Sequence, residues 1–243
     1  MLEDIESILR NQCGLERDRL VVAGVSGGPD SLCLMEVLRE AGYPVMVAHF
    51  NHHLRPESQA EAAHVQEIAR RLDLPYVSGE ADVHAHADAE GRSLEEAARR
   101  LRYAFLFEQA RRYEAQAVAV GHTADDQVET VLMHFLRGAG LTGLKGMTYR
   151  TFLPSFERRI PVVRPLLDTW REETVACCAA RGLQPVMDPS NASTEFMRNR
   201  LRNVLIPSLE EYNPKFRQVA WRSAQSLQLD HALLREMVEA AWG

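Results

Sequence analysis

The chain has 243 residues and a mass of 27.4 kDa, enough for one large domain or for one domain with a smaller appendage. Apolar residues make up 46% of it and charged residues 26%, a composition that excludes disordered and fibrous proteins. The net charge of −6 is unevenly spread, because residues 1–136 hold 13 basic and 23 acidic side chains whereas residues 137–222 hold 14 basic and 8 acidic ones. We therefore expect the second half to face a polyanion.

The N-terminus and the cysteines exclude further classes. No apolar run approaches the roughly 20 residues of a membrane helix. The first residues also lack the basic-then-apolar pattern of a secretion signal, so we expect a cytoplasmic protein that contacts no membrane. The four cysteines, Cys13, Cys33, Cys177 and Cys178, form no C-x-x-C pair, which argues against a zinc knuckle, an iron–sulfur site or a disulfide framework.

Short apolar runs alternate with helical patterns through the first half of the chain. The runs predict strands at residues 20–25, 44–49, 74–78 and 115–121. The patterns between them predict helices at 29–39, 57–72, 93–113 and 124–136, of which the third opens on the capping-box pattern Ser93-Leu-Glu-Glu96. This alternation predicts an α/β fold with a parallel, doubly wound sheet, whose ligands bind beyond the carboxyl ends of the strands.

The pattern changes after residue 137. Residues 137–146 are a glycine-rich loop, and residues 149–165 are typical of irregular or short extended pieces. Helices are expected at 169–181 and 195–205, followed by one long amphipathic helix from residue 214 to the end. Because this helix ends at Trp242-Gly243 without a cap, we expect more protein to follow it or a partner to cover an exposed tryptophan.

The segment Ser26-Gly-Gly-Pro-Asp-Ser31 lies between the first predicted strand and its helix. Gly27 and Gly28 let backbone amides approach an anion, the helix N-terminus adds its positive end, and two serines add hydroxyls. The segment therefore indicates a phosphate site, although the chain has no G-x-x-x-x-G-K-[ST] motif. The plainer alternative is a tight turn capped by a serine.

Two acidic residues lie at the start of the helix predicted from residue 124. Asp126 and Glu129 fall on the helix face opposite its apolar residues, and His122 stands at the helix mouth. The apolar residues are Val128, Val131, Leu132 and Phe135. Acids at the end of the fourth strand could hold Mg²⁺ or an amine, whereas the alternative is a solvated face that stabilises the helix dipole.

Arginines form two further candidate sites. Arg99 and Arg102 lie one turn apart beside Tyr103, on the flank of a predicted buried stripe, where they could clamp a phosphate. The stripe consists of Leu94, Ala98, Leu101 and Phe105, and the alternative for the arginines is surface pairing with Glu95 and Glu96. The second site holds Arg198, Arg200 and Arg202, which either bind RNA or ATP phosphates or lie on a solvated face.

The segment after the second strand is rich in histidine. His49, Asn51, His52 and His53 follow the strand directly, where alternation sends neighbours in opposite directions and no cysteine or carboxylate completes a ligand set. We therefore favour contact with a nucleotide or RNA over a metal site.

The loop Ser26-Gly-Gly-Pro-Asp-Ser31 resembles that of the N-type ATP pyrophosphatase (PP-loop) superfamily, whose fold is that of the adenine nucleotide alpha hydrolases. Further segments, in order from about residue 20 to 210, resemble the tRNA(Ile)-lysidine synthase family. These segments are 47–55, 96–103, 120–130, 137–147, 164–167, 188–191, 198–202 and 206–207. The chain departs from the family pattern at Ser193, where the pattern has an acidic residue, and in lacking the C-terminal modules of many members.

The resemblance implies a reaction. ATP and free L-lysine would convert the wobble cytidine of the CAU-anticodon isoleucine tRNA to lysidine, through an adenylated tRNA and with release of pyrophosphate and AMP. Residues 1–210 would form the PP-loop catalytic domain and 211–243 a helical linker to a further C-terminal module. The partners are this tRNA and lysine, and a homodimer stays open.

The resemblance also implies roles for residues of this chain. Those expected to act in catalysis are Asp30, Asp126, Glu129 and Arg99, with Asp30 and Asp126 as the ligands of Mg²⁺. Those expected to bind ATP are Ser26, Gly27, Gly28, Pro29, Asp30, Ser31, His49, Gly121, His122 and Arg102. Those expected to bind tRNA or lysine are Asn51, His52, Arg55, Asp126, Glu129, Arg198, Arg200 and Arg202.

Three alternatives remain at this point. A tRNA thiolation enzyme shares the loop but usually brings cysteines for sulfur transfer. A non-catalytic adenine-nucleotide-binding module would leave the segments at 188–191 and 198–202 without a purpose. A catalytically incomplete fragment would keep the nucleotide site and bind tRNA weakly.

Overall fold

The computed structural model describes residues 4–53, 58–186 and 196–242. The chain divides into two compact units. Unit 1 comprises Met1–Gly121 and Tyr149–Met187, and unit 2 comprises His122–Thr148 and Asp188–Gly243. The basic stretch 137–222 is therefore shared between the two units.

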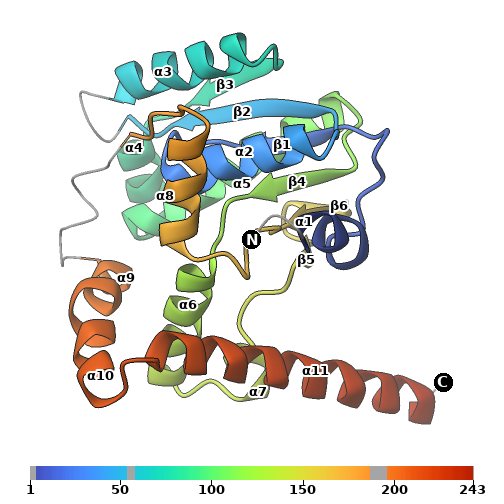
Figure 1. Cartoon of the computed structure of the whole chain (residues 1–243), viewed down its shortest axis with the longest axis vertical. Helices are drawn as coiled ribbons and strands as arrows, with labels where there is room; N and C mark the ends of the chain where they lie inside the picture. The colour runs from blue at the N-terminus through green and yellow to red at the C-terminus, as the bar shows by residue number, and fades with distance from the viewer. Residues whose placement is uncertain (1–3, 54–57, 187–195, 243) are drawn as a thin grey trace. The chain divides into compact units, whose positions relative to one another are not determined.

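Unit 1 is built on a six-stranded sheet with the order β3-β2-β1-β4-β6-β5 (Figure 1). The strands are β1 (Val21–Gly24), β2 (Val45–Asn51), β3 (Tyr76–Glu80), β4 (Ala117–Val120), β5 (Arg150–Leu153) and β6 (Glu157–Val163). All neighbours pair in parallel except β5, which pairs antiparallel with β6 at the sheet edge. The predicted α/β class with a parallel sheet is confirmed.

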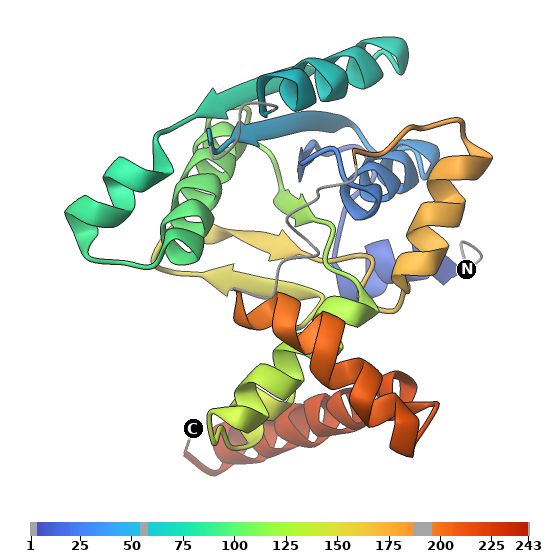
Figure 2. The same cartoon turned by 90° about the vertical axis from the view of Figure 1, so that its left-hand side faces the viewer.

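Helices cover both faces of this sheet (Figure 2). They are α1 (Ile5–Ser7), η2 (Ile8–Gln12), α2 (Pro29–Glu40), α3 (Ser58–Arg71), α5 (Leu94–Arg112) and α8 (Arg171–Ala180), whereas α4 (Val83–Glu90) packs against α5. Alternation along β1 divides the core, because Val21 and Ala23 pack with α2 and α8 whereas Val22 packs with α5. The central strands β1, β2 and β4 are thus buried on both faces, which explains their continuous apolar runs.

Unit 2 is helical. It contains α6 (Ala124–Leu136), α7 (Leu141–Leu144), α9 (Met197–Arg200), the π-helical turn η4 (Leu201–Leu205), α10 (Ile206–Tyr212) and α11 (Phe216–Trp242). The glycine-rich loop around α7 is fixed from two helices. Gln127 of α6 exchanges hydrogen bonds with both backbone groups of Met147, and Gln228 of α11 donates to the same carbonyl at 2.8 Å.

Several sequence expectations need correction. The region 149–165 is a hairpin that extends the sheet, with a register shift between Thr151 and Leu153, and its polar start and Pro161 conceal that pattern. Helices α4 and α7 and the N-terminal helical turns were not expected. The predicted helix 195–205 consists of α9 and η4.

The buried stripe of α5 also differs from expectation. Phe105 is buried as predicted, but Leu94, Ala98 and Leu101 are only partly buried. The fully buried Tyr103 belongs to the core and not to a flank. In unit 2, Phe135 is 66% exposed, so the apolar face of α6 is covered only over its first turns.

None of the described helices is both long and apolar enough to cross a membrane.

Candidate active site

The phosphate loop, residues 26–31, is held together by the side chain of Ser31. Its Oγ accepts hydrogen bonds from the N–H groups of Ser26 at 3.1 Å and Gly27 at 3.2 Å, and its hydroxyl donates to the carbonyl of Gly28 at 2.9 Å. Gly27 has a φ of +95°, a conformation that favours glycine. The Ser31 hydroxyl therefore shapes the loop from inside.

The first turn of α2 supplies groups that can bind an anion. Gly28 is the N-cap, and Pro29 occupies the start of the helix. The N–H groups at a helix start have no acceptor within the helix and carry the positive end of its dipole. Because proline has no N–H, the candidate donors are the backbone groups of Gly28, Asp30 and Ser31.

Gly121 allows β4 to end directly against this turn. A Cβ atom at Gly121 would lie 2.8 Å from the carbonyl oxygen of Asp30 and 3.1 Å from the amide nitrogen of Ser31. Only glycine tolerates such an approach to backbone atoms without a shift of the loop. Gly121 is thus required for packing against the loop, and its place in a nucleotide site stays a prediction.

The carboxylate of Asp30 has a protein partner on each oxygen. Arg171 donates from Nη2 to Oδ2 at 2.9 Å, and the buried hydroxyl of Thr174 donates to Oδ1 at 2.5 Å. Both partners come from α8. The sequence-based interpretation of Asp30 as a Mg²⁺ ligand did not anticipate these contacts.

Of the polar residues at the end of β2, His49 and Asn51 are buried, whereas the following His53 is exposed. The ring of His49 is 4% exposed, and its Nδ1 lies 2.9 Å from the carbonyl of Val25. Burial lowers the pKa of His49, so the ring is neutral at pH 7 and its Nδ1–H donates to that carbonyl. Asn51 accepts from the backbone N–H of His53 at 2.9 Å, and His53 contacts Glu80. Each of these side chains has its own separate partner.

His52 lies near Arg102 of α5, and both Arg102 and Arg99 contact Tyr103 of the same helix. Burial, together with the charge of Arg102, lowers the pKa of His52 to about 4. The guanidinium carbons of Arg99 and Arg102 lie 4.8 and 5.6 Å from the ring centroid of Tyr103, the geometry of a cation–π contact. Both expected phosphate-binding arginines are therefore anchored on one buried ring.

Arg164 joins this group, although no role was expected for it from the sequence. It follows β6, is 4% exposed and donates to the hydroxyl of Thr151 at 3.0 Å. Burial lowers its pKa, and the nearby charge of Arg99 lowers it further. In the sequence, only the family-like segment Arg164-Pro-Leu-Leu167 pointed to this residue.

In unit 2, Asp126 closes the start of α6. Its Oδ2 accepts from the backbone N–H of Thr123 at 2.9 Å and from the Thr123 hydroxyl at 3.2 Å, while its own N–H points back to that hydroxyl. These contacts form a capping box. Asp126 is 9% exposed, so its side chain does not lie on a solvated face, but the capping box is the helix-end stabilisation that the alternative also named.

Glu129 lies one turn further along α6 and is 1% exposed. The Nε of Arg202 donates to its Oε1 at 2.6 Å, and the Nε of Arg198 lies 3.0 Å from its Oε2 without the alignment of a hydrogen bond. The Nη2 of Arg202 also lies 3.6 Å from Oδ1 of Asp126. Arg198 and Arg202 thus form a cluster with the two acids, and only Arg200 of the three predicted arginines is exposed.

The two acids of this cluster differ in pKa. Burial alone would raise the pKa of Asp126, but His122, Arg198, the Thr123 N–H and Arg202 together hold it below its usual value. For Glu129 burial dominates, and its pKa is raised although Arg202 and Arg198 oppose the shift. The cluster therefore combines one carboxylate that keeps its charge with one that accepts a proton more readily.

Other expected residues lie outside these two groups. Arg55 and the segments at 188–191 and 193 fall outside the described residues. In the part of the chain that is described, no three His, Cys, Asp or Glu side chains come together as a metal site. With both Asp30 oxygens engaged by α8, the described side chains do not fit Mg²⁺ as a site made by protein alone.

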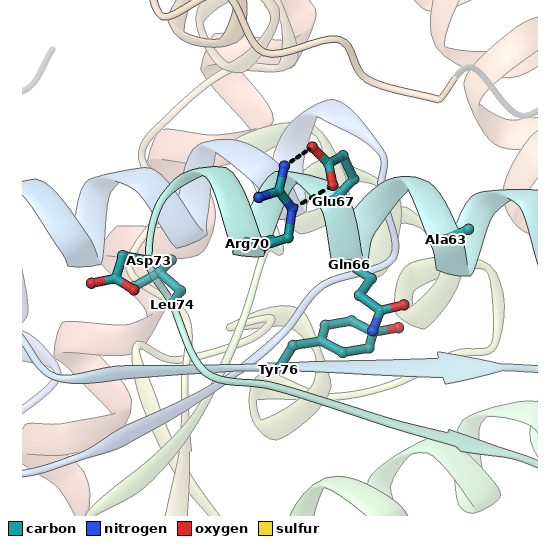
Figure 3. A pocket seen from close by; sticks show the side chains of 7 residues that line it. All are labelled: Ala63, Gln66, Glu67, Arg70, Asp73, Leu74 and Tyr76. Carbon is teal, nitrogen blue, oxygen red and sulfur yellow. Dashed lines mark hydrogen bonds and ion pairs between the residues drawn. The ribbon is translucent and has the colours of Figure 1, made fainter.

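A surface pocket lies elsewhere, between α3 and the start of β3 (Figure 3). Its lining consists of Ala63, Gln66, Glu67, Arg70, Asp73, Leu74 and Tyr76. The pair Arg70–Glu67 spans part of it at 2.7 Å. None of the predicted site residues lines this pocket, and Tyr76 begins β3, so the pocket is at the amino end of that strand.

Residues 1–209 match the model of the PP-loop domain family. The chain belongs to the PP-loop domain family. Among curated proteins it is 40% identical, over 98% of its length, to a tRNA(Ile)-lysidine synthase of Dehalococcoides mccartyi, and 42% identical, over 92%, to one of Geobacter sulfurreducens. It covers 52% and 47% of these relatives, so it spans about half the length of the curated relatives it matches.

The PP-loop fold is also found among solved structures. A U34-tRNA thiolase of Methanococcus maripaludis superposes with a TM-score of 0.71 at 18% identity, covering 93% of this chain and 78% of that one. An NMN synthetase of Francisella tularensis gives a TM-score of 0.52 at 14% identity, covering 75% of this chain and 70% of that one. At these identities the similarity establishes the fold alone.

Proposed function

We propose that the protein joins lysine to C2 of the wobble cytidine of CAU-anticodon tRNA(Ile), with ATP converted to AMP and pyrophosphate. The strongest support for the proposal is that the chain aligns over 98% of its length with a curated tRNA(Ile)-lysidine synthase. Under this proposal the phosphate loop would serve pyrophosphate release, and the buried acid–arginine cluster would serve proton transfer from the lysine amine.

In the first step the cytosine O2 would attack the α-phosphate of ATP and release pyrophosphate. Backbone N–H groups of Gly28, Asp30 and Ser31 and the dipole of α2 would stabilise the charge that builds on the leaving group. Arg99 and Arg102, which are already anchored on Tyr103, would neutralise further charge. Mg²⁺ would arrive bound to ATP.

In the second step a lysine amine would attack C2 and displace AMP. The amine must lose a proton, because a free lysine side chain has a pKa of about 10.4. Asp126, whose pKa is lowered, would hold the incoming ammonium, and Glu129, whose pKa is raised, would accept its proton. The two acids that the sequence left interchangeable would thus have different roles.

The remaining expectations belong to the same proposal. His49, Asn51 and His52 would line the nucleotide or RNA site, His122 would act beside Asp126, and Arg55 and Arg200 would contact tRNA. Residues 1–210 would act as the catalytic domain and 211–243 as a linker. The reaction would take place in the cytoplasm, where its tRNA substrate is found, and a homodimer remains open.

Sulfur transfer is less well supported. Burial raises the pKa of Cys13 and of Cys178 to about 12, which keeps both thiols protonated at neutral pH. The contact with Cys33 lowers the pKa of Cys177, so Cys177 is the thiol that a sulfur-transfer role would have to use.

The proposal is tested by measuring pyrophosphate release from ATP with and without CAU-anticodon tRNA(Ile), while lysine incorporation into the RNA is followed in parallel. We expect release that requires this tRNA, with lysine incorporated. Release without incorporation would contradict the proposal and indicate another acceptor, and ATP binding without release would indicate a nucleotide-binding module.

A further inference from the structure

One face of α8 contacts the phosphate loop through consecutive turns. Arg171 and Thr174 bind the two carboxylate oxygens of Asp30, and the thiol of Cys178 donates to the carbonyl of Pro29 at 3.4 Å. These three residues follow the i, i+3, i+7 spacing of a single helix face. After α8, the N–H of Val186 donates to the carbonyl of Gly27 at 2.9 Å. All of these residues belong to unit 1.

The contacts at Asp30 address an electrostatic difficulty. Asp30 lies in the first turn of α2, where the backbone N–H groups are suited to phosphate. A carboxylate at that place stabilises the helix dipole but repels an incoming polyphosphate. The Arg171 guanidinium, 2.9 Å from Oδ2, compensates the charge, and the Asp30 side chain is only 13% exposed, so screening by water is limited.

The same contacts disagree with the role of metal ligand. Mg²⁺ requires carboxylate oxygens that are open to it in near-octahedral geometry. Here one oxygen is bound by a cation and the other by a hydroxyl at 2.5 Å. A divalent ion at Asp30 would have to displace or adjoin the positive charge of Arg171.

We propose that Arg171 and Thr174 are positioning residues for the phosphate loop. They fix the Asp30 carboxylate, neutralise it and so set the affinity of the loop for the pyrophosphate portion of a nucleoside triphosphate. Asp30 is then an anchor between α2 and α8 and not a metal ligand. This inference rests on the proposed use of ATP and names residues that the sequence did not suggest.

The chain offers a matched control. Arg181, at the other end of α8, pairs with Glu40 at the end of α2 at 2.6 Å. Arg181→Ala therefore removes an ion pair between the same two helices, but far along them from the loop. A loss that reflects only weaker packing of α8 would appear in Arg171→Ala and Arg181→Ala alike.

The experiment measures equilibrium ATP binding by the full chain without tRNA or lysine, with and without Mg²⁺, alongside the melting temperature. Arg171→Ala is expected to weaken ATP binding about tenfold or more, because it removes the charge-assisted pair that neutralises Asp30. Arg171→Lys keeps the positive charge and is expected to recover part of this loss. Thr174→Val is expected to weaken binding about threefold. Arg181→Ala is expected to stay within about twofold of the unmodified protein.

Asp30→Asn separates an anchor from a metal ligand. If Asp30 is an anchor, this variant should change ATP binding by the same factor with and without Mg²⁺. A loss confined to the Mg²⁺ samples would overturn the inference, as would equal binding by the Arg171→Ala and Arg181→Ala variants. If Arg171→Ala does not fold, Arg171→Lys and Thr174→Val provide the same comparison. Arg171-dependent ATP binding without lysine incorporation would contradict the proposed function and leave this inference standing.

Discussion

The phosphate loop and the acid–arginine cluster are built in opposite ways. The loop is formed by six consecutive residues, and a single side chain, Ser31, fixes its backbone. The cluster joins Glu129 to Arg202, a partner 73 residues away, and to Arg198, both on a segment with a π-helical turn. A site made of backbone is therefore local and robust, whereas a site made of buried charges depends on the whole unit that encloses it.

The contrast extends to what each site can do. Backbone N–H groups carry fixed partial charges that no change of pH removes. Buried carboxylates instead have pKa values that their neighbours set, which is why Asp126 and Glu129 shift in opposite directions beside the same arginines. The loop is suited to holding a phosphate, and the cluster is suited to moving a proton.

Glu129→Gln should have the strongest effect on activity. The amide oxygen can still accept from Arg202, so we expect the fold to persist while proton acceptance is lost. Lysine incorporation should fall about 100-fold to 10,000-fold, the usual range for loss of a general base. Asp125→Asn is the matched control, since Asp125 lies one turn before Glu129 on α6 and pairs with Arg217 of α11 at 3.2 Å. Equal losses in the two variants would remove Glu129 from the chemistry.

A smaller effect is expected from Gly121→Ala. The new Cβ would meet the Asp30 carbonyl at 2.8 Å, so the loop must shift, at a cost of about 1–3 kcal/mol and with weaker ATP binding. Gly140→Ala is the control, because nothing lies within 4 Å of a Cβ there. Chemical denaturation and ATP titration of both variants measure the difference. A Gly121→Ala variant as stable as Gly140→Ala would show that the approach of β4 to the loop is not tight.

His52 tests whether burial controls a titratable group in unit 1. Its pKa of about 4 in the folded chain lies below the ordinary 6.5, so between these values only the unfolded chain binds the proton. Stability from His52 is therefore complete above pH 6.5 and is lost as the pH falls, by about 2 kcal/mol between pH 7 and pH 5. His52→Gln should flatten the unfolding free energy over this range. His53→Gln, at an exposed neighbour, should keep the slope, and an unchanged slope in His52→Gln would contradict the burial argument.

The weakest effect concerns the three arginines of the second basic site. Arg200 is exposed, so Arg200→Ala should reduce the dependence of log tRNA affinity on log salt by about one unit. Arg198→Ala and Arg202→Ala should leave the salt slope unchanged, because both residues already pair with Glu129. Curves of tRNA binding at several salt concentrations measure the slope for each variant. A slope that falls equally for all three would place them together on the RNA surface.

The sequence predicted the parts of the fold that depend on local patterns. The strands β1, β2 and β4, the bounds of α6 and the N-cap at Ser93 follow from apolar runs and capping residues. The hairpin of β5 and β6 was not predicted, because Pro161 and the Glu157-Arg158-Arg159 segment conceal a strand that tertiary packing stabilises.

The candidate site divides in the same way. The phosphate loop was predictable since its six residues are adjacent, and Gly121 because it ends a strand. The pairing of Arg171 with Asp30, the burial of Arg164 and the acid–arginine cluster were not, because each joins residues far apart in the chain. Sequence spacing shows which residues share a helix face but not which distant cation reaches a buried acid.

Pyrophosphate release and proton transfer are assigned to two different sites, the phosphate loop and the acid–arginine cluster. A single-turnover measurement on Glu129→Gln, with ATP and CAU-anticodon tRNA(Ile), separates the two steps when lysine incorporation is followed beside pyrophosphate release. We expect pyrophosphate to be released close to the rate of the unmodified protein while lysine incorporation is lost. Loss of pyrophosphate release together with incorporation, in a variant that still melts as a folded protein, would refute this division of labour.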